Sequence, residues 1–158
     1  MNFQQLLCLY ENRAHAESAL LLKLNDKTIQ MLQNIQIPEE PNGETMTRLD
    51  PSRLHATLIS FRNFKNEPDR ESIARHDFEA PEIVPGETRF VYRPGKVTYV
   101  LSLQNQKELK EFVDKLYSQV GKTNPEPNRF FHVTLANNMG GDPFKSIGDV
   151  TQDDFKKI

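Results

Sequence analysis

Apolar positions recur at strand or helix spacing along most of the chain, and they divide it into an ordered series of elements. Residues 1–15 are apolar at Phe3, Leu6, Leu7 and Tyr10, a spacing that predicts a short amphipathic helix. The apolar run that follows is too short for a helix of its own. Residues 19–22 are therefore predicted to form a buried strand.

Two further helices are predicted, each with its own start or stop signal. Asn25 and Asp26 are good N-cap residues for a helix whose apolar positions repeat at helical spacing as far as Ile35. The second helix begins at Gln104 or Asn105 and is followed by a glycine that suits a helix end. Further strands are predicted at residues 54–61, 89–92, 97–103 and 130–137, with a Pro-Gly turn between the second and third.

The order of elements is the same in the two halves of the chain. Each half has an apolar strand, a polar N-cap, an amphipathic helix, a proline-rich break and a second strand. We therefore expect an α+β fold with two similar lobes related by a pseudo-twofold axis, and with two antiparallel sheets that form a central cleft with the helices outside. The single domain would comprise one lobe at about 16–62, a polar excursion at 63–87, a second lobe at about 88–138 and a C-terminal loop and tail at 139–158.

The second strand of each half carries the same short motif, an apolar residue followed by His, a small or β-branched residue, Thr and Leu. Side chains alternate across a strand, so the His and the Thr of each copy share one face. Each copy therefore offers one imidazole and one hydroxyl on a rigid element. The two copies are His55-Ala56-Thr57-Leu58 and His132-Val133-Thr134-Leu135.

Composition narrows the class of protein. The chain has 158 residues, of which 37% are hydrophobic and 27% are charged, as in ordinary globular domains. A net charge of −2 argues against a protein that holds long nucleic acid by neutralising phosphates. Cys8 is alone, which fits a reducing cytoplasm, and no apolar run approaches the roughly 20 residues of a membrane span. We expect a cytoplasmic monomer that binds neither membranes nor duplex DNA.

The paired His-x-Thr motifs and the repeated order of elements resemble the two-histidine phosphoesterase superfamily over roughly residues 18–138. That superfamily includes 2′-5′ RNA ligase-like proteins, RNA 2′,3′-cyclic phosphodiesterases, viral 2′-5′ oligoadenylate phosphodiesterases and phage enzymes that destroy cyclic-oligonucleotide immune signals. The resemblance implies a phosphodiesterase that works without a metal or another cofactor. It leaves open which phosphodiester is the substrate.

The chemistry of the motif agrees with such an activity. Cleavage of an RNA-type phosphodiester needs one group to deprotonate the nucleophile and another to protonate the leaving oxygen. Histidine suits both roles near neutral pH, so His55 and His132 are the candidate acid and base. Thr57 and Thr134 could donate hydrogen bonds to the phosphate oxygens. A half-buried structural histidine is the alternative reading of either motif taken alone.

Several other residues are weaker candidates for substrate binding. Four are predicted to contact a nucleotide, the arginine through phosphate and the aromatic residues by stacking on a base: Tyr10, Phe61, Arg89 and Tyr92. For each of these residues, the alternative to nucleotide binding is packing within the protein or exposure to solvent. No cysteine cluster or carboxylate stands at ligand spacing from the motif histidines, so a metal site is not expected. The glycine-rich residues 137–144 form either a cover over the site or an ordinary turn.

Three functions remain open from the sequence. The first is cleavage of small or cyclic oligonucleotides, including cyclic immune messengers if the chain is viral. The second is an RNA 2′,3′-cyclic or 2′-5′ phosphodiesterase in RNA processing. The third is a non-catalytic protein that sequesters a short RNA or nucleotide, or an adaptor that uses its first residues. The presence of both His and Thr in both motifs favours an enzyme.

Overall fold

The computed structural model describes residues 6–12, 17–64, 66–74 and 80–156, which form one antiparallel sheet with helices packed against it. The described strands are β1 (Leu6–Asn12), β2 (Glu17–Lys23), β3 (Thr47–Arg48), β4 (His55–Ile59), β5 (Pro85–Arg93), β6 (Lys96–Leu103) and β7 (His132–Asn137). The described helices are α1 (Asp26–Gln33), α2 (Phe61–Phe64), α3 (Arg70–Ala74) and α4 (Gln106–Ser118), with short 3-10 helices η2 (Pro51–Arg53), η3 (Pro143–Lys145) and η4 (Gln152–Phe155). The expected α+β class is confirmed.

The two motif strands, β4 and β7, are neighbours at the centre of the sheet. The strand order is β1-β2-β4-β7-β6-β5, and the short strand β3 pairs with the end of β7. The prediction of two separate sheets is wrong for the described residues, because Ala56 and Val133 pair and join the halves into one sheet. The predicted bilobal arrangement is wrong as well: strands from both expected lobes, 16–62 and 88–138, belong to this one sheet, and the described residues show no bilobal repeat.

The first element is a strand, not the amphipathic helix that the spacing predicted. β1 pairs antiparallel with β2, with Leu6 opposite Leu22 and Cys8 opposite Leu20. A short apolar run suits a strand as well as a helix, and the adjacent apolar run of β2 provides a hairpin partner. Residues 1–5 and 13–15 of the predicted helix lie outside the described residues.

The other predicted elements agree with the structure. Asn25 caps α1 by accepting a hydrogen bond from the Thr28 backbone N–H at 2.8 Å. Helix α4 buries the apolar positions that predicted it, and Gly121 follows it with a φ of 72°, a conformation that glycine adopts readily. The polar excursion contains α3 and leads into β5. No helix in the described part of the chain combines the length and the apolar character needed to cross a bilayer.

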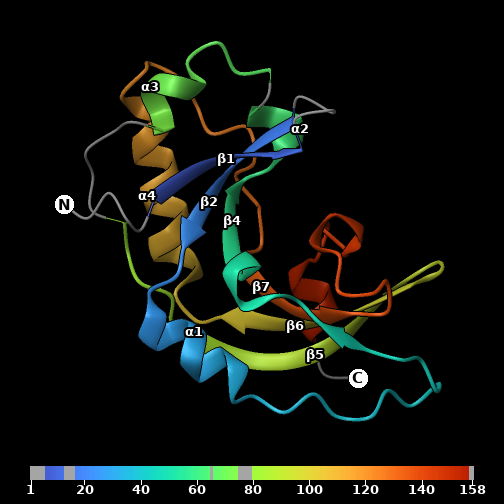
Figure 1. Ribbon diagram of the computed structural model, residues 1–158. Coiled ribbons are helices and arrows are strands. Elements are labelled where there is room, and N and C mark those ends of the chain that lie inside the picture. Colours follow the sequence, from blue (N-terminus) through green and yellow to red (C-terminus); the bar gives the residue numbers. More distant parts are fainter. Residues whose placement is uncertain (1–5, 13–16, 65, 75–79, 157–158) are drawn as a thin grey trace.

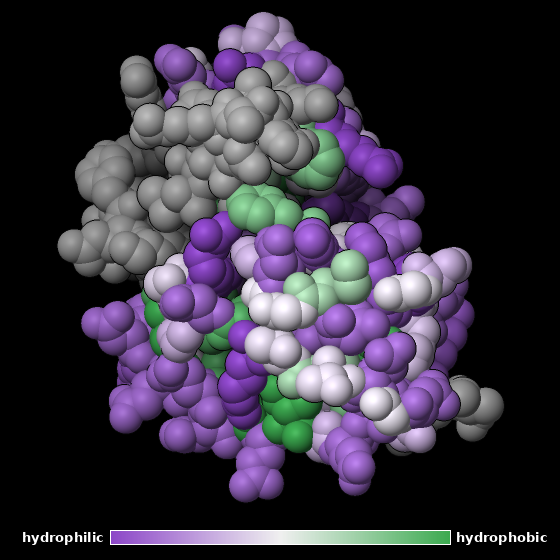
Figure 2. Space-filling view, turned by 45° about the vertical axis from the view of Figure 1, so that its right-hand side comes forward, coloured by the Kyte–Doolittle hydropathy of each residue, from purple (hydrophilic) through white to green (hydrophobic). Residues whose placement is uncertain are grey.

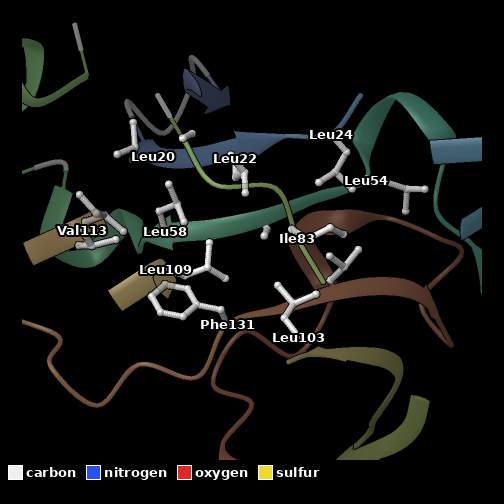
Figure 3. Packing of buried hydrophobic residues seen from close by; sticks show 14 of the residues in the cluster. Leu20, Leu22, Leu24, Leu54, Leu58, Ile83, Leu103, Leu109, Val113 and Phe131 are labelled. Carbon is white, nitrogen blue, oxygen red and sulfur yellow. The ribbon is translucent and has the colours of Figure 1, made fainter. Parts of the chain in front are cut away.

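The main core lies on the helical side of the sheet. Figure 3 shows Leu20, Leu58 and Phe131 directed toward Leu109 and Val113 of α4, so side chains from the sheet and the helix interdigitate. All five side chains are buried. Burial of each contributes on the order of 2 kcal/mol to folding, so this face fixes the position of the central strands.

A second, smaller cluster lies on the opposite face of the sheet. Residues 138–156, here called the C-terminal segment, place Ile147 and Val150 against Val91 of β5 and Val100 of β6. In Figure 1, α4 lies on one side of the strands and the C-terminal segment, coloured red, lies on the other. One half of the sheet is therefore covered on both faces.

Candidate active site

The His and Thr of each motif project from the face of the sheet opposite the main core. In β4, Ala56 and Leu58 are buried in the core, whereas His55 and Thr57 on the alternate positions are only partly buried. In β7, Val133 and Leu135 belong to the core, and His132 and Thr134 alternate with them. These alternations place all four motif side chains on one face.

The pairing of β4 with β7 brings the two motifs together. Ala56 pairs with Val133, and these are the middle residues of the two His-x-Thr motifs. In an antiparallel pair, the residue that follows one partner lies opposite the residue that precedes the other. His55 therefore lies beside Thr134, and Thr57 lies beside His132. The four predicted catalytic residues thus gather at one place on the sheet.

Both histidines are oriented by a backbone carbonyl two residues earlier. The Nδ1 of His55 lies 2.7 Å from the carbonyl oxygen of Arg53, and the Nδ1 of His132 lies 3.4 Å from that of Phe130. A carbonyl oxygen only accepts, so Nδ1 is the protonated nitrogen of each neutral ring. The opposite nitrogen, Nε2, then carries the lone pair that can take a proton from a substrate.

Burial keeps both imidazoles neutral at neutral pH. Desolvation, together with the smaller effect of the nearby positive charge of Arg129, lowers the pKa of His132 to about 4. Desolvation also lowers the pKa of His55, with smaller contributions from the charges of Arg53 and Arg129. The charge of His55 itself acts on the pKa of His132, so the two rings are close enough to interact.

Arg129 is a charged residue at this site that the sequence pattern did not distinguish from other arginines. Its Nε donates to the carbonyl oxygen of Thr57 at 3.1 Å, and its Nη1 donates to Glu126 at 3.3 Å. Glu126 in turn accepts from the backbone N–H of Ser60 at 3.2 Å. The Arg129 side chain is only 14% exposed, and burial lowers its pKa. The contacts hold one guanidinium next to both histidines.

Gln106, the first residue of α4, fixes the backbone just before the second motif. Its Nε2 donates to the carbonyl oxygens of Phe131 and Leu103 at 2.7 and 2.9 Å, and its Oε1 accepts from the Phe131 N–H at 2.8 Å. No sequence signal identified this residue, because a glutamine at a helix start is common. Its contacts make the helix a support for His132.

Arg89 lies on the motif face, where it contacts Glu87 of its own strand and the C-terminal segment. It pairs with Val100, which pairs with Thr134 on the next strand, so the three share a face. The guanidinium donates to the carbonyl oxygen of Lys156 at 2.9 Å and lies 5.9 Å from the ring centre of Phe155. Arg89 therefore holds the C-terminal segment on the sheet.

The other three predicted binding residues lie on three different elements. Tyr92 lies on the opposite, core face of the sheet, where its hydroxyl donates to Glu40 at 2.7 Å and its pKa is raised to about 12 by that hydrogen bond. Phe61 opens α2 directly after β4 and is partly exposed. Tyr10 lies in β1 opposite Ser18, and only its backbone is described.

In the described part of the chain, neither a metal cluster nor the pocket beside α4 involves the motifs. Among the residues that the structure describes, no group of three or more His, Cys, Asp and Glu side chains is placed to hold a metal. An open pocket of about 490 Å³ lies beside α4, and Glu82, Glu108, Glu111 and Lys115 are among its lining residues. Its excess of carboxylates would repel a phosphate, so the motif face is the better candidate for phosphate chemistry.

Comparison with known proteins identifies no relative of this chain. No protein-family model matches the chain, and neither the curated proteins nor the solved structures include a significant match. The functional argument therefore depends on the residues and geometry of the motif face.

Proposed function

We propose that the chain is a metal-independent phosphodiesterase that cleaves RNA-type phosphodiester bonds in small or cyclic oligonucleotides, with His55 and His132 as its acid and base. The observation that carries this proposal is the matched setting of the two rings. Each sits beside the threonine of the other motif, and each has its Nδ1 at a carbonyl two residues earlier. Such a pair can deprotonate the attacking oxygen and protonate the leaving oxygen of a phosphoryl transfer.

The reaction needs one neutral histidine and one protonated histidine. The Nε2 of the neutral ring takes the proton from a water or a 2′-hydroxyl as that oxygen bonds to phosphorus. The other, protonated ring donates its proton to the leaving oxygen as the P–O bond breaks. Binding of the phosphodiester anion raises the histidine pKa values and favours the singly protonated pair, whereas repulsion between the rings disfavours two charges. Solvent exchange then restores the starting states.

Three further groups suit the developing charge on the phosphate. Within the described residues, the Oγ1 atoms of Thr57 and Thr134 make no hydrogen bond, so both hydroxyls can donate to non-bridging oxygens. The guanidinium of Arg129 provides a fixed positive charge close to both rings. Because this charge is already desolvated and anchored, it needs little reorganisation when substrate binds.

The size and charge of the chain favour a small substrate. A net charge of −2 provides little general attraction for a long phosphate backbone, so binding must come from a few local contacts. A cyclic di- or trinucleotide, a short 2′-5′ oligonucleotide and a nucleoside 2′,3′-cyclic phosphate all present the required linkage. Degradation of cyclic nucleotide immune signals is the role we favour among these.

The test is an assay of the purified protein in EDTA against cyclic di- and trinucleotides, linear 2′-5′ and 3′-5′ oligonucleotides, and nucleoside 2′,3′-cyclic phosphates. We expect cleavage of at least one cyclic or short substrate, and the fastest reaction identifies the substrate class. Cleavage of linear RNA ends alone would exclude the immune-signal role. Recovery of every compound unchanged would contradict catalysis and favour a nucleotide-sequestering protein.

A further inference from the structure

Resting on the proposed function, we infer that Arg53 and Phe144 form a base-stacking subsite beside His55, on which the nucleobase attached to the scissile phosphate lies. The guanidinium carbon of Arg53 is 5.2 Å from the ring centre of Phe144. Arg53 ends η2 directly before β4, and its carbonyl oxygen accepts from the His55 ring. The pair therefore flanks the first catalytic histidine.

Among the described residues, the C-terminal segment stacks Phe144 on Arg53 and Phe155 on Arg89, and Phe144 is the more exposed of the two rings. Phe144 is 45% exposed, whereas the ring centre of Phe155 lies 5.4 Å from that of Phe130 and the ring packs on the second apolar cluster. On the face that Figure 2 shows, hydrophilic residues are interspersed with smaller apolar areas. A single exposed ring such as Phe144 suits a small flat ligand.

Hydrogen bonds from one buried side chain hold Phe144 in place. Asn137, at the end of β7, donates to the Asp142 carbonyl and the Ser146 hydroxyl, both at 2.8 Å, and accepts from the N–H groups of Met139 and Gly141. The Asp142 carboxylate accepts from the Phe144 N–H at 3.0 Å. The hydrogen bonds of a turn thus hold the exposed ring, which agrees with the interpretation of residues 137–144 as an ordinary turn.

Close packing adds to this fixation. A Cβ atom at Gly141 would lie 2.6 Å from the carbonyl oxygen of Arg48 in β3, and the glycine has a φ of 76°. Only glycine fits this approach without strain. The loop that carries Phe144 is therefore seated on the sheet, and the ring is presented without the entropy loss of ordering a loose segment.

The chemistry of the pair selects a nucleobase. Every base has a π-face that stacks on an aromatic ring or a guanidinium plane, whatever its hydrogen-bonding edge. The positive charge of Arg53 is near enough to act on His55, so it also favours the phosphate that the base carries. The subsite would bind bases with little sequence preference and would orient the phosphate toward the histidines.

The direct test uses tryptophan fluorescence, because the chain contains no tryptophan. In the Phe144→Trp protein, a nucleoside 5′-monophosphate should quench the emission, and ribose 5-phosphate should not. The Tyr92→Trp protein is the control, since residue 92 is similarly exposed but lies on the other face of the sheet. Equal quenching of the Phe144→Trp protein by both ligands, or none by the nucleotide, would overturn the subsite.

A second arm separates this inference from the catalytic proposal. Calorimetry on Phe144→Ala should give about tenfold weaker binding of the nucleotide and unchanged binding of ribose 5-phosphate. The matched control is Met31→Ala, another exposed apolar side chain, which should bind both ligands as the parent does. Unchanged nucleotide binding by Phe144→Ala would reject the subsite and leave catalysis untouched. Nucleotide binding that depends on Phe144 in a protein without turnover would support the subsite and reject catalysis.

Discussion

Ala56 and Val133 pair with each other where β4 meets β7, and each is the middle residue of its His-x-Thr motif. This pairing creates a local twofold relationship, in which the histidine of one motif lies beside the threonine of the other. The core side of the same strands carries apolar side chains, so neither strand can slip by one residue without turning its own imidazole into the core. The packing of the sheet therefore fixes the geometry of the proposed acid–base pair.

Stability should fall in acid because His132 is buried as a neutral ring. Its pKa is about 4, against 6.5 in the unfolded chain, so the unfolded state binds more protons between these pH values. The free energy of unfolding should decrease by about 3 kcal/mol as the pH falls from 6.5 to 4, and His55 should contribute in the same direction. Urea unfolding of the parent and His132→Asn at several pH values checks this. Identical pH profiles would contradict the buried neutral ring.

Replacement of Arg129 should alter both histidines at once. The charge of Arg129 lowers the pKa of His55 and of His132, so Arg129→Gln should raise both pKa values. NMR titration of the ring protons measures them. The same change should slow kcat/KM by about tenfold or more, because a charge near the phosphate is lost. Arg62→Gln, which alters an exposed arginine on α2, is the control and should leave the titration unchanged.

Gln106 should support both stability and catalysis. Gln106→Leu leaves the N–H and carbonyl of Phe131 without their partner, so we expect a loss of about 2 kcal/mol in the free energy of unfolding. A displaced His132 should also lower kcat with little change in KM. Chemical denaturation and steady-state kinetics give the two values. Gln30→Leu, at an exposed position of α1, should change neither, and equal behaviour of the two variants would exclude the supporting role.

Two buried tyrosines should respond in opposite ways to loss of the hydroxyl. Tyr117 is buried, and its hydroxyl has no hydrogen-bond partner in the described part of the chain, whereas the Tyr99 hydroxyl donates to Thr88 at 2.8 Å. Tyr117→Phe should raise the free energy of unfolding by about 1 kcal/mol, and Tyr99→Phe should lower it by a similar amount. Thermal or urea unfolding checks both. Destabilisation by Tyr117→Phe would indicate that the hydroxyl is satisfied.

The sequence predicted the elements with strong local signals. The cap at Asn25, the apolar face of α4 and the turn after Arg93 depend on neighbouring residues, and the structure has all three. The sequence could not predict β1, because a short apolar run suits a helix and a strand equally. The hairpin that β1 forms with β2 decides between them. The joining of two expected sheets into one also depends on a long-range contact, the Ala56–Val133 pair.

The candidate site was predictable to a similar extent. The alternation of side chains along β4 and β7 was enough to place His and Thr of each motif on one face. The supporting residues were not predictable, since Arg129, Gln106 and Phe144 act through contacts with residues distant in the sequence. Tyr92 was selected for its residue type, but strand register turned it to the core face toward Glu40.

The central claim, that His55 and His132 act as one acid–base unit, is tested most directly by a double-mutant cycle on the best substrate in EDTA. We predict that His55→Ala and His132→Ala each reduce kcat by about 100-fold or more, and that the double variant is little worse than either single variant. Substrate binding should persist in all three. Full activity in either single variant, or multiplicative losses in the double variant, would contradict the claim.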